Sequence, residues 1–243
     1  MNFILLLGAG FSRNWGGWLA SEAFEYLLGC PEFDEGLKEL LWQHKRSGGF
    51  EAALAQLQVE HARAGRATPD QRLVNFQNAL LRMFADMDKA FSDVPLEFQN
   101  DREYQIAPFL IRFHAIFTLN QDLLLERHYL NENISLLSGQ RWDGGHIPGM
   151  KRVAAPASPL DNPNLGKWEP NPNGFAVSPR LQPYFKLHGS SNWVASGSDE
   201  LLVLGDNKRS IIDRYPVLKW SHEQFKASLS KPNTSLMVIG YSF

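Results

Sequence analysis

The spacing of apolar residues divides the chain into short buried strands and amphipathic helices. Residues 2–8 form an apolar run that ends at a glycine, which is the pattern of a buried strand. Residues 114–122, 184–194 and 201–206 also have strand patterns, and so does the segment SLMVIGYSF, which begins at Ser235. Because helical patterns separate several of these strands, the sequence predicts an α/β fold with a mostly parallel sheet.

Between the first two strands the apolar residues repeat with a helical period. The residues from about 18 to 92 are therefore expected to form a helical insertion of several helices, separated by Gly29/Pro31, Gly48-Gly49 and Thr68-Pro69. The clearest apolar stripe consists of Leu73, Phe76, Leu80, Met83, Phe84 and Met87. Shorter helical patterns cover 103–113 and 123–130, on either side of the second strand.

Residues from about 139 to 183 have a different composition. Eight of the fourteen prolines lie there, with glycine, asparagine and serine between them. This composition is unfavourable for regular elements, so we expect a long Pro-rich loop or extended insertion.

Small or hydrogen-bonding residues follow four of the predicted strands. The first strand runs into GAGFS (8–12), the second into TLNQD (118–122), the third into His188-Gly189 and the last into GYS (240–242). In parallel α/β sheets, ligands bind beyond the carboxyl ends of the strands. We therefore expect these four segments to line one ligand cleft.

The opening glycines favour a phosphate contact, because a strand–Gly-x-Gly–helix turn lets backbone N–H groups approach an anion. The common dinucleotide fingerprint requires a third glycine, however, and Arg13 stands at that position. No acidic residue closes a second strand about twenty residues later. Both departures argue against a nicotinamide-dependent dehydrogenase. Ser12 is able either to donate to a phosphate or to cap the following helix.

Composition and charge exclude several classes of protein. The 243 residues carry a net charge of −2 with no basic run, which gives no indication of nucleic acid or an acidic membrane as a partner. The single cysteine, Cys30, excludes a disulfide framework and a cysteine-rich zinc site. The apolar run at the start is too short for a signal peptide or a membrane span, so we expect a cytoplasmic protein with one domain over 1–243.

The four strand-end segments, in this order, resemble motifs of the sirtuin family (silent-information-regulator proteins). GAGFS resembles the family's opening phosphate-binding segment, and TLNQD is similar to its Thr-x-Asn-x-Asp motif. KLHG (186–189) resembles its His-Gly element, and GYS its late Gly-x-Ser nucleotide contact. Protein-deacylating sirtuins carry a zinc module with four cysteines, which this chain lacks. With the helices of 18–92, the chain looks more like the zinc-free, NAD-consuming sirtuin-like effectors of bacterial anti-phage defence.

The resemblance implies a Rossmann-like, NAD-binding domain with NAD as substrate, no zinc, and a role for each matched residue. Asn120 holds the nicotinamide ribose or orients the attacking water, and His188 acts as general base on the ribose hydroxyls. Asp122 contacts the nicotinamide carboxamide. The other cofactor-binding residues implied are Gly8, Ala9, Gly10 and Ser12 near the pyrophosphate, Gly189 beside the histidine, and Gly240 and Ser242 on the adenosine side.

These residue types suit the chemistry. Cleavage of the nicotinamide–ribose bond leaves an oxocarbenium-like sugar, which requires positioning, a polarised water or hydroxyl, and exclusion of solvent. An ordinary histidine is largely neutral at pH 7 and is able to accept a proton. Plainer interpretations remain open: His188 as a buried hydrogen-bonded imidazole, Asn120 and Asp122 as caps of the next helix, and Ser12 as a cap.

The expected function is therefore an NAD glycohydrolase that yields nicotinamide and ADP-ribose. The alternatives are a zinc-free NAD-dependent deacylase or ADP-ribosyltransferase, and a non-catalytic domain that binds NAD or ADP-ribose. A homo-oligomer or a defence-system partner protein is expected as a further partner. Since no helical segment follows the last strand, we also expect that the chain is truncated at its C-terminal side.

Overall fold

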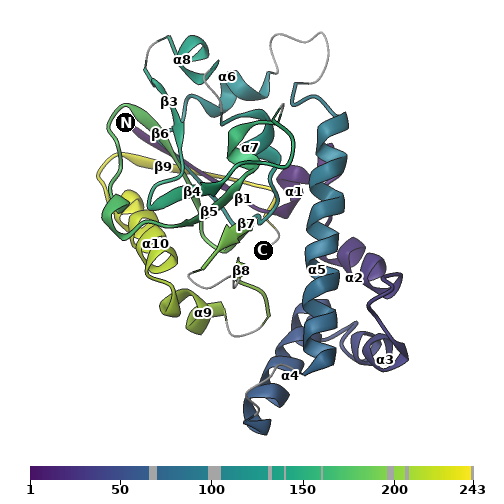
Figure 1. Ribbon diagram of the computed structural model, residues 1–243. Helices are drawn as coiled ribbons and strands as arrows, with labels where there is room; N and C mark the ends of the chain where they lie inside the picture. The colour runs from purple at the N-terminus through teal and green to yellow at the C-terminus, as the bar shows by residue number, and fades with distance from the viewer. Residues whose placement is uncertain are drawn as a thin grey trace.

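A five-stranded sheet forms the centre of the protein (Figure 1). The computed structural model describes residues 1–65, 70–97, 105–130, 133–139, 141–159, 161–195, 200–205 and 208–241. The strand order is β3-β6-β2-β1-β9, and every pairing is parallel. The bounds are β1 (Asn2–Leu7), β2 (Ala115–Thr118), β3 (Gly144–His146), β6 (Leu181–Lys186) and β9 (Thr234–Ile239). The predicted Rossmann-like α/β fold is confirmed.

Alternate residues of the strands enter two different hydrophobic clusters, as the period of a strand requires. Ile4, Phe117 and Phe185 face α10 (Pro216–Leu229), where Phe225 packs on Phe117 with ring centroids 4.9 Å apart. Residues such as Leu5 belong to the larger cluster on the other face. Because residues of β1 and β2 are buried on both faces of the sheet, these strands appear in the sequence as continuous apolar runs.

The hydrophobic pattern did not lead us to predict α10 or the shorter helix α9 (Lys208–Arg214) before it. Both helices lie in the stretch between the predicted strands 201–206 and 235–243. Pro216 at the first turn of α10 is the local signal for the start of this helix.

The predicted helical insertion is confirmed. It contains α2 (Ala20–Leu28), α3 (Glu35–Gln43), α4 (Gly49–Ala64) and α5 (Gln71–Ala90). All six residues of the predicted stripe on α5 are buried. Figure 1 shows α5 as a long helix between the sheet and the pair α2 and α3. The insertion therefore faces the sheet through α5 and adds a wall beside it.

The Pro-rich insertion has more regular structure than its composition predicted. Besides β3 it contains β4 (Met150–Ala154) and β5 (Lys167–Pro170). These strands join β7 (Gly189–Val194) and β8 (Glu200–Leu202) in a second sheet of order β4-β5-β7-β8. Bonds to residues far along the chain support it: Asn192 Nδ2 donates to the carbonyl oxygens of Asn164 and Gly166 at 2.9 and 2.8 Å.

In the described ranges, further short α-helices are α1 (Ala9–Ser12), α6 (Ile106–Leu110), α7 (Leu124–His128) and α8 (Asn133–Leu137). The segment that contains β9 was predicted as a buried strand. The strand is present but lies at the sheet edge, where it pairs only with β1, and Leu236 and Met237 are 41% and 46% exposed. Over the ranges described above, none of the helices combines the length and apolar character that a membrane span requires.

Candidate functional site

A cavity of about 920 Å³ lies at the carboxyl ends of β1, β2 and β9. Its lining includes seven of the ten site residues predicted from the sequence: Gly8, Ala9, Gly10, Asn120, Asp122, His188 and Gly240. Ser12 and Gly189 are adjacent to lining residues but do not face the cavity themselves. Ser242 lies outside the described residues. The structure thus brings the four predicted strand-end segments to one place.

The glycines let the ends of β1 and β9 approach each other closely. The N–H of Gly8 donates to Ile239 O at 2.9 Å, and the N–H of Gly10 donates to Gly240 O at 2.8 Å. Gly240 has a φ of +71°, and a Cβ there would lie 2.0 Å from the backbone nitrogen of Phe11. A side chain would therefore force the two strand ends apart, and these glycines are required for the shape of the cavity floor.

Three polar side chains form a connected group beside this floor. Ser12 Oγ donates to Asp122 Oδ2 at 2.8 Å, and Asn120 Nδ2 donates to Ser12 Oγ at 3.0 Å. The other carboxylate oxygen, Asp122 Oδ1, accepts from the N–H of Leu124 at the start of α7, at 3.1 Å. Asp122 thus supports the helix start and also orders Ser12. Ser12 makes no capping bond; its buried hydroxyl connects the other two side chains.

His188 occupies the short connection between β6 and β7 and lines the cavity. None of the described residues hydrogen-bonds to its ring nitrogens, so the structure gives no support to a fully bonded core imidazole. Burial lowers the pKa of His188 to about 4, and the Lys208 ammonium and the His222 ring add to this shift. At pH 7 the imidazole is therefore neutral and able to accept a proton.

Gln121, which the sequence analysis did not single out, holds the His188 segment against the end of β2. The side-chain Nε2 of Gln121 donates to the backbone carbonyl oxygens of His188 and Val203 at 3.2 and 2.8 Å. The backbone carbonyl oxygen of Gln121 accepts from the N–H of Ser191 at 2.9 Å. Its position between Asn120 and Asp122 was the available signal. Gly189 has a φ of +77°, and its Cβ would lie 1.9 Å from Leu201 O, so this glycine shapes the backbone next to the histidine.

The helical insertion supplies the apolar wall of the cavity. Trp18, Phe50, Met83, Phe84 and Met87 belong to this wall. The apolar stripe predicts burial of Met83, Phe84 and Met87, and the structure shows that these three side chains also line the cavity. Such a wall excludes water and strengthens electrostatic interactions inside the cavity.

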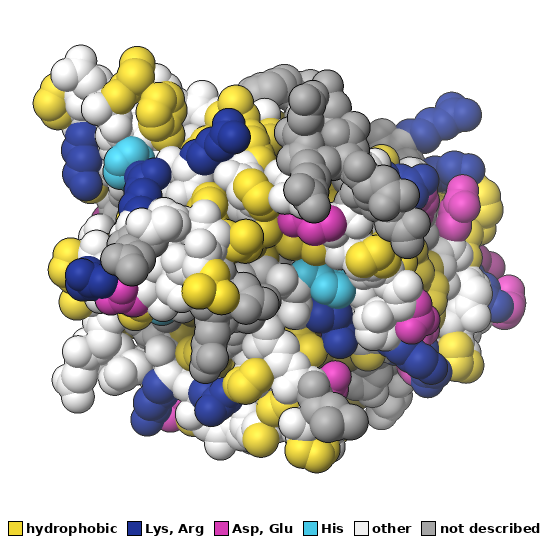
Figure 2. All heavy atoms as spheres, turned by 90° about the horizontal axis from the view of Figure 1, so that it is seen from above, with side chains coloured by type: hydrophobic (Ala, Val, Ile, Leu, Met, Phe, Trp, Pro, Cys, Tyr) yellow, Lys and Arg dark blue, Asp and Glu magenta, His cyan; other side chains and the backbone are white. Residues whose placement is uncertain are grey.

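An ion pair on the cavity wall joins the insertion to α9. Lys208 Nζ lies 2.7 Å from Glu51 Oε2, and both residues line the cavity. On the face seen from above in Figure 2, the Lys and Arg side chains are dispersed and do not gather in one patch. Lys208 lines the cavity beside Glu51, and its charge contributes to the low pKa of His188.

The buried carboxyl group of Asp88 on α5 bonds to the segment that follows Asp122 and to β7. Asp88 Oδ1 accepts from the N–H of Leu123 at 2.9 Å, and Oδ2 accepts from Ser191 Oγ at 3.1 Å. Burial, with a contribution from the Asp122 charge, raises the pKa of Asp88 to about 7. The folded protein therefore binds a proton here between about pH 4 and pH 7 that the unfolded chain releases. The stability contributed by this proton is complete at low pH and is lost as the pH rises to 7.

The variant Asp88→Asn is expected to remove this pH dependence. The amide keeps both partners, because its oxygen accepts from Leu123 and its NH₂ donates to Ser191 Oγ. We expect a gain of about 1–2 kcal/mol at pH 8, or roughly 2–8 °C in Tm, and little change at pH 5. Thermal melts at both pH values measure it. Asp86→Asn, on the exposed side of α5, is the control without this gain. An equal Tm change at both pH values would contradict the assignment.

Within the described part of the chain, no group of three or more His, Cys, Asp or Glu side chains is placed to hold a metal ion. The chemistry available in the cavity is that of a neutral imidazole, an amide, a carboxylate and a lysine–glutamate pair beside an apolar wall. Comparison of the sequence with models of protein families gives no match, and comparison with curated proteins gives no significant match.

Proposed function

We propose that the protein binds NAD in this cavity and hydrolyses the bond between nicotinamide and ribose, which yields nicotinamide and ADP-ribose. The observation that carries the proposal is the meeting of Asn120, Asp122 and His188 at the glycine-rich end of a parallel sheet. The cavity volume of about 920 Å³ suits a dinucleotide-sized ligand. The sirtuin-like order of the motifs supports the same substrate.

In the proposed reaction the C1′–N bond breaks and its electron pair moves to the nicotinamide ring, which leaves as a neutral molecule. Water adds to the oxocarbenium-like C1′ and loses one proton, so that NAD and water give nicotinamide, ADP-ribose and a proton. The neutral His188 receives a proton from a ribose hydroxyl or from the water. Asn120 orients that group, because Ser12 fixes the amide through its Nδ2 atom.

The remaining parts of the cavity bind and shield the substrate. Asp122 accepts bonds from Ser12 and Leu124, and a carboxylate has further acceptor sites for the carboxamide NH₂ of nicotinamide. The apolar wall of the insertion protects the cationic sugar from bulk water. We also propose that this activity serves in anti-phage defence in the cytoplasm, as the resemblance implies.

The direct test is to incubate the purified protein with NAD and to measure nicotinamide and ADP-ribose by chromatography. Their release in equal amounts supports the proposal. Tight ADP-ribose binding by calorimetry without any product over hours favours a non-catalytic binding domain. Formation of acyl-ADP-ribose with an acetylated peptide favours a deacylase. The absence of both binding and turnover contradicts an NAD site in this cavity.

The low pKa of His188 predicts the acidic limb of the pH profile. A base with a pKa of about 4 stays neutral down to that value, so kcat/KM is expected to fall only as the pH approaches 4. Removal of the Lys208 charge in Lys208→Met raises the pKa, and the limb moves toward neutral pH. Removal of the opposite charge in Glu51→Gln moves the limb the other way or leaves it unchanged.

The profiles of kcat/KM against pH for these variants measure the effect. Lys151→Met is the matched control, because Lys151 forms a similar ion pair with Glu169, at 2.8 Å, but lies outside the cavity lining. If Lys208→Met and Glu51→Gln shift the limb in the same direction, the charges do not act on His188 as described.

A further inference from the structure

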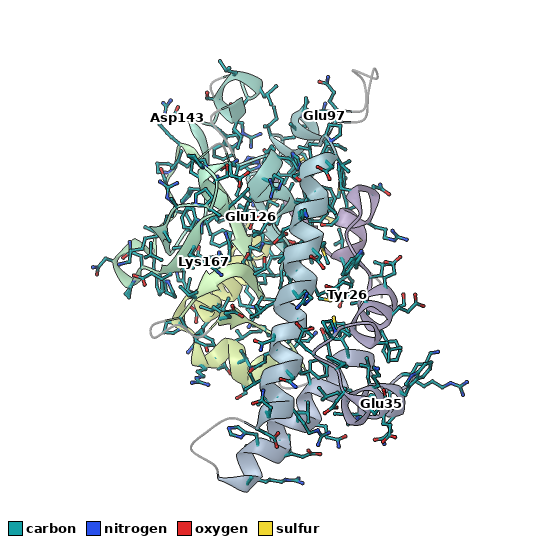
Figure 3. All side chains as sticks on the ribbon, turned by 45° about the vertical axis from the view of Figure 1, so that its right-hand side comes forward. Tyr26, Glu35, Glu97, Glu126, Asp143 and Lys167 are labelled. Carbon is teal, nitrogen blue, oxygen red and sulfur yellow. The ribbon has the colours of Figure 1, made fainter. Side chains whose placement is uncertain are left out.

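A completely buried ion pair lies beneath the turn that carries Asn120 and Asp122. Lys186 on β6 and Glu126 on α7 have side chains that are 0% exposed, and Lys186 Nζ lies 2.6 Å from Glu126 Oε1. Figure 3 shows Glu126 in the interior, near α5 and the sheet. Removing two charges from water costs free energy that their attraction does not always recover, and apolar residues of similar size are often as stable. The presence of this pair therefore requires a reason beyond packing.

The contact that an apolar pair cannot reproduce is the bond from Lys186 to the turn. Lys186 Nζ also donates to the backbone carbonyl oxygen of Asp122. Tyr184 OH approaches Glu126 Oε2 at 3.4 Å from the same strand as Lys186. The ammonium thus has two oxygen partners, of which one is a side chain and the other is the backbone of a predicted site residue.

This backbone bond reaches the site through a short chain of contacts. The Asp122 carbonyl is fixed by Lys186, and the Asp122 carboxylate accepts from Ser12, whose oxygen accepts from Asn120. The N–H of Asn120 donates to Thr118 Oγ1 at 3.0 Å and closes the turn from its other side. A rotation of the Asp122 peptide would displace the carboxylate and, with it, the hydroxyl and the amide.

We infer that Lys186, with its charge balanced by Glu126, is a positioning residue that holds the 119–124 turn in the geometry of the ligand site. The inference about the turn rests on the contacts above, and its consequence for catalysis rests on the proposed NAD hydrolysis. Lys186 does not touch the substrate, because its side chain is fully buried and does not line the cavity.

The experiment compares two variants that both break the ion pair. Lys186→Met removes the bond to Asp122, whereas Glu126→Gln keeps Lys186 and an acceptor oxygen for it. Both variants are expected to have a lower Tm, because each leaves one buried group without its charged partner. Hydrogen exchange of the peptide 119–124, normalised to the β1 amides, is expected to be about tenfold faster in Lys186→Met and close to wild type in Glu126→Gln. Equal normalised exchange in the two variants overturns the inference.

A double variant keeps the test decisive if a single variant does not fold. Lys186→Met combined with Glu126→Leu replaces both charges by apolar groups, and we expect its Tm to recover toward that of the wild type. If the pair holds the turn, exchange over 119–124 stays fast although the Tm has recovered. Wild-type exchange in the double variant shows that the pair only fills space, and overturns the inference. Tyr184→Phe, which spares the Asp122 carbonyl, is the control expected to keep the turn protected.

Hydrogen exchange is measured without substrate, so it tests the inference about the 119–124 turn even if the wild type does not cleave NAD. Where the wild type does cleave NAD, the double variant is expected to lose kcat/KM by about tenfold or more at its recovered stability. Undiminished kcat/KM in a double variant whose turn exchanges rapidly would overturn the positioning role while leaving the proposed reaction in place.

Discussion

Replacing His188 or Asn120 by alanine is expected to reduce nicotinamide release from NAD by about 10²-fold or more. His188→Ala removes the neutral imidazole to which we assign the proton-accepting role in the cavity. Asn120→Ala removes the amide that is bonded to Ser12 and that we propose orients the reacting group. The Tm of both variants is expected to stay near that of the wild type. The His188 ring has no hydrogen-bond partner in the described part of the protein, and Ser12 keeps its bond to Asp122 without Asn120.

The control for these variants is a histidine at the opposite end of the sheet. His114 accepts from the N–H of Phe3 through Nδ1 at 3.0 Å, so His114→Ala loses a hydrogen bond but leaves the cavity unchanged. We expect turnover close to wild type for this variant. Full activity of either His188→Ala or Asn120→Ala, measured as nicotinamide release under saturating NAD, would remove that residue from the proposed mechanism.

Gly240→Ala is expected to cause a large loss of stability. The added Cβ would meet the Phe11 backbone nitrogen at 2.0 Å and the Gly10 carbonyl carbon at 2.5 Å, and the φ of +71° is strained for alanine. Since backbone atoms cannot move aside separately, we expect a loss of about 3 kcal/mol or more, or roughly 6–12 °C in Tm. Thermal melts followed by circular dichroism measure this change.

Gly65→Ala is the control that separates the steric clash of the added Cβ from the strain of the left-handed backbone conformation. Gly65 also has a positive φ, of +58°, but a Cβ there has no atom within 4 Å. Its expected cost is about 1 kcal/mol, which is that of the left-handed conformation alone. If the two variants lose the same stability, the close approach of the β1 and β9 ends does not exist in solution.

The parts of the fold that could be predicted from the sequence are those whose pattern is local. The run in β1 and the stripe on α5 identify their own elements, because burial on both faces or on one helical face leaves a regular period. β4 and β5 have no such period. They form because β7 and the Asn192 amide supply partners from elsewhere in the chain, and this is not visible in a short window.

Some residues of the candidate site could likewise be predicted from local patterns, and others could not. Asn120 and Asp122 follow β2 and His188 follows β6, so the parallel pairing of these two strands brings them to one edge. Glu51 and Lys208 reach the cavity only because the insertion packs beside α9. Lys186 and Glu126 have charged side chains that are usually at the surface, and nothing in their spacing indicates that they meet in the interior.

The pairing of β1 with β9 places Asn2 opposite Thr234, so the cavity floor is made by segments that lie 232 residues apart in the chain. A nascent chain on the ribosome lacks this floor until β9 and Gly240 have emerged. Incomplete translation products and chains cut before β9 therefore have no assembled site. For the proposed NAD hydrolase, this topology confines the activity to molecules that contain both β1 and β9.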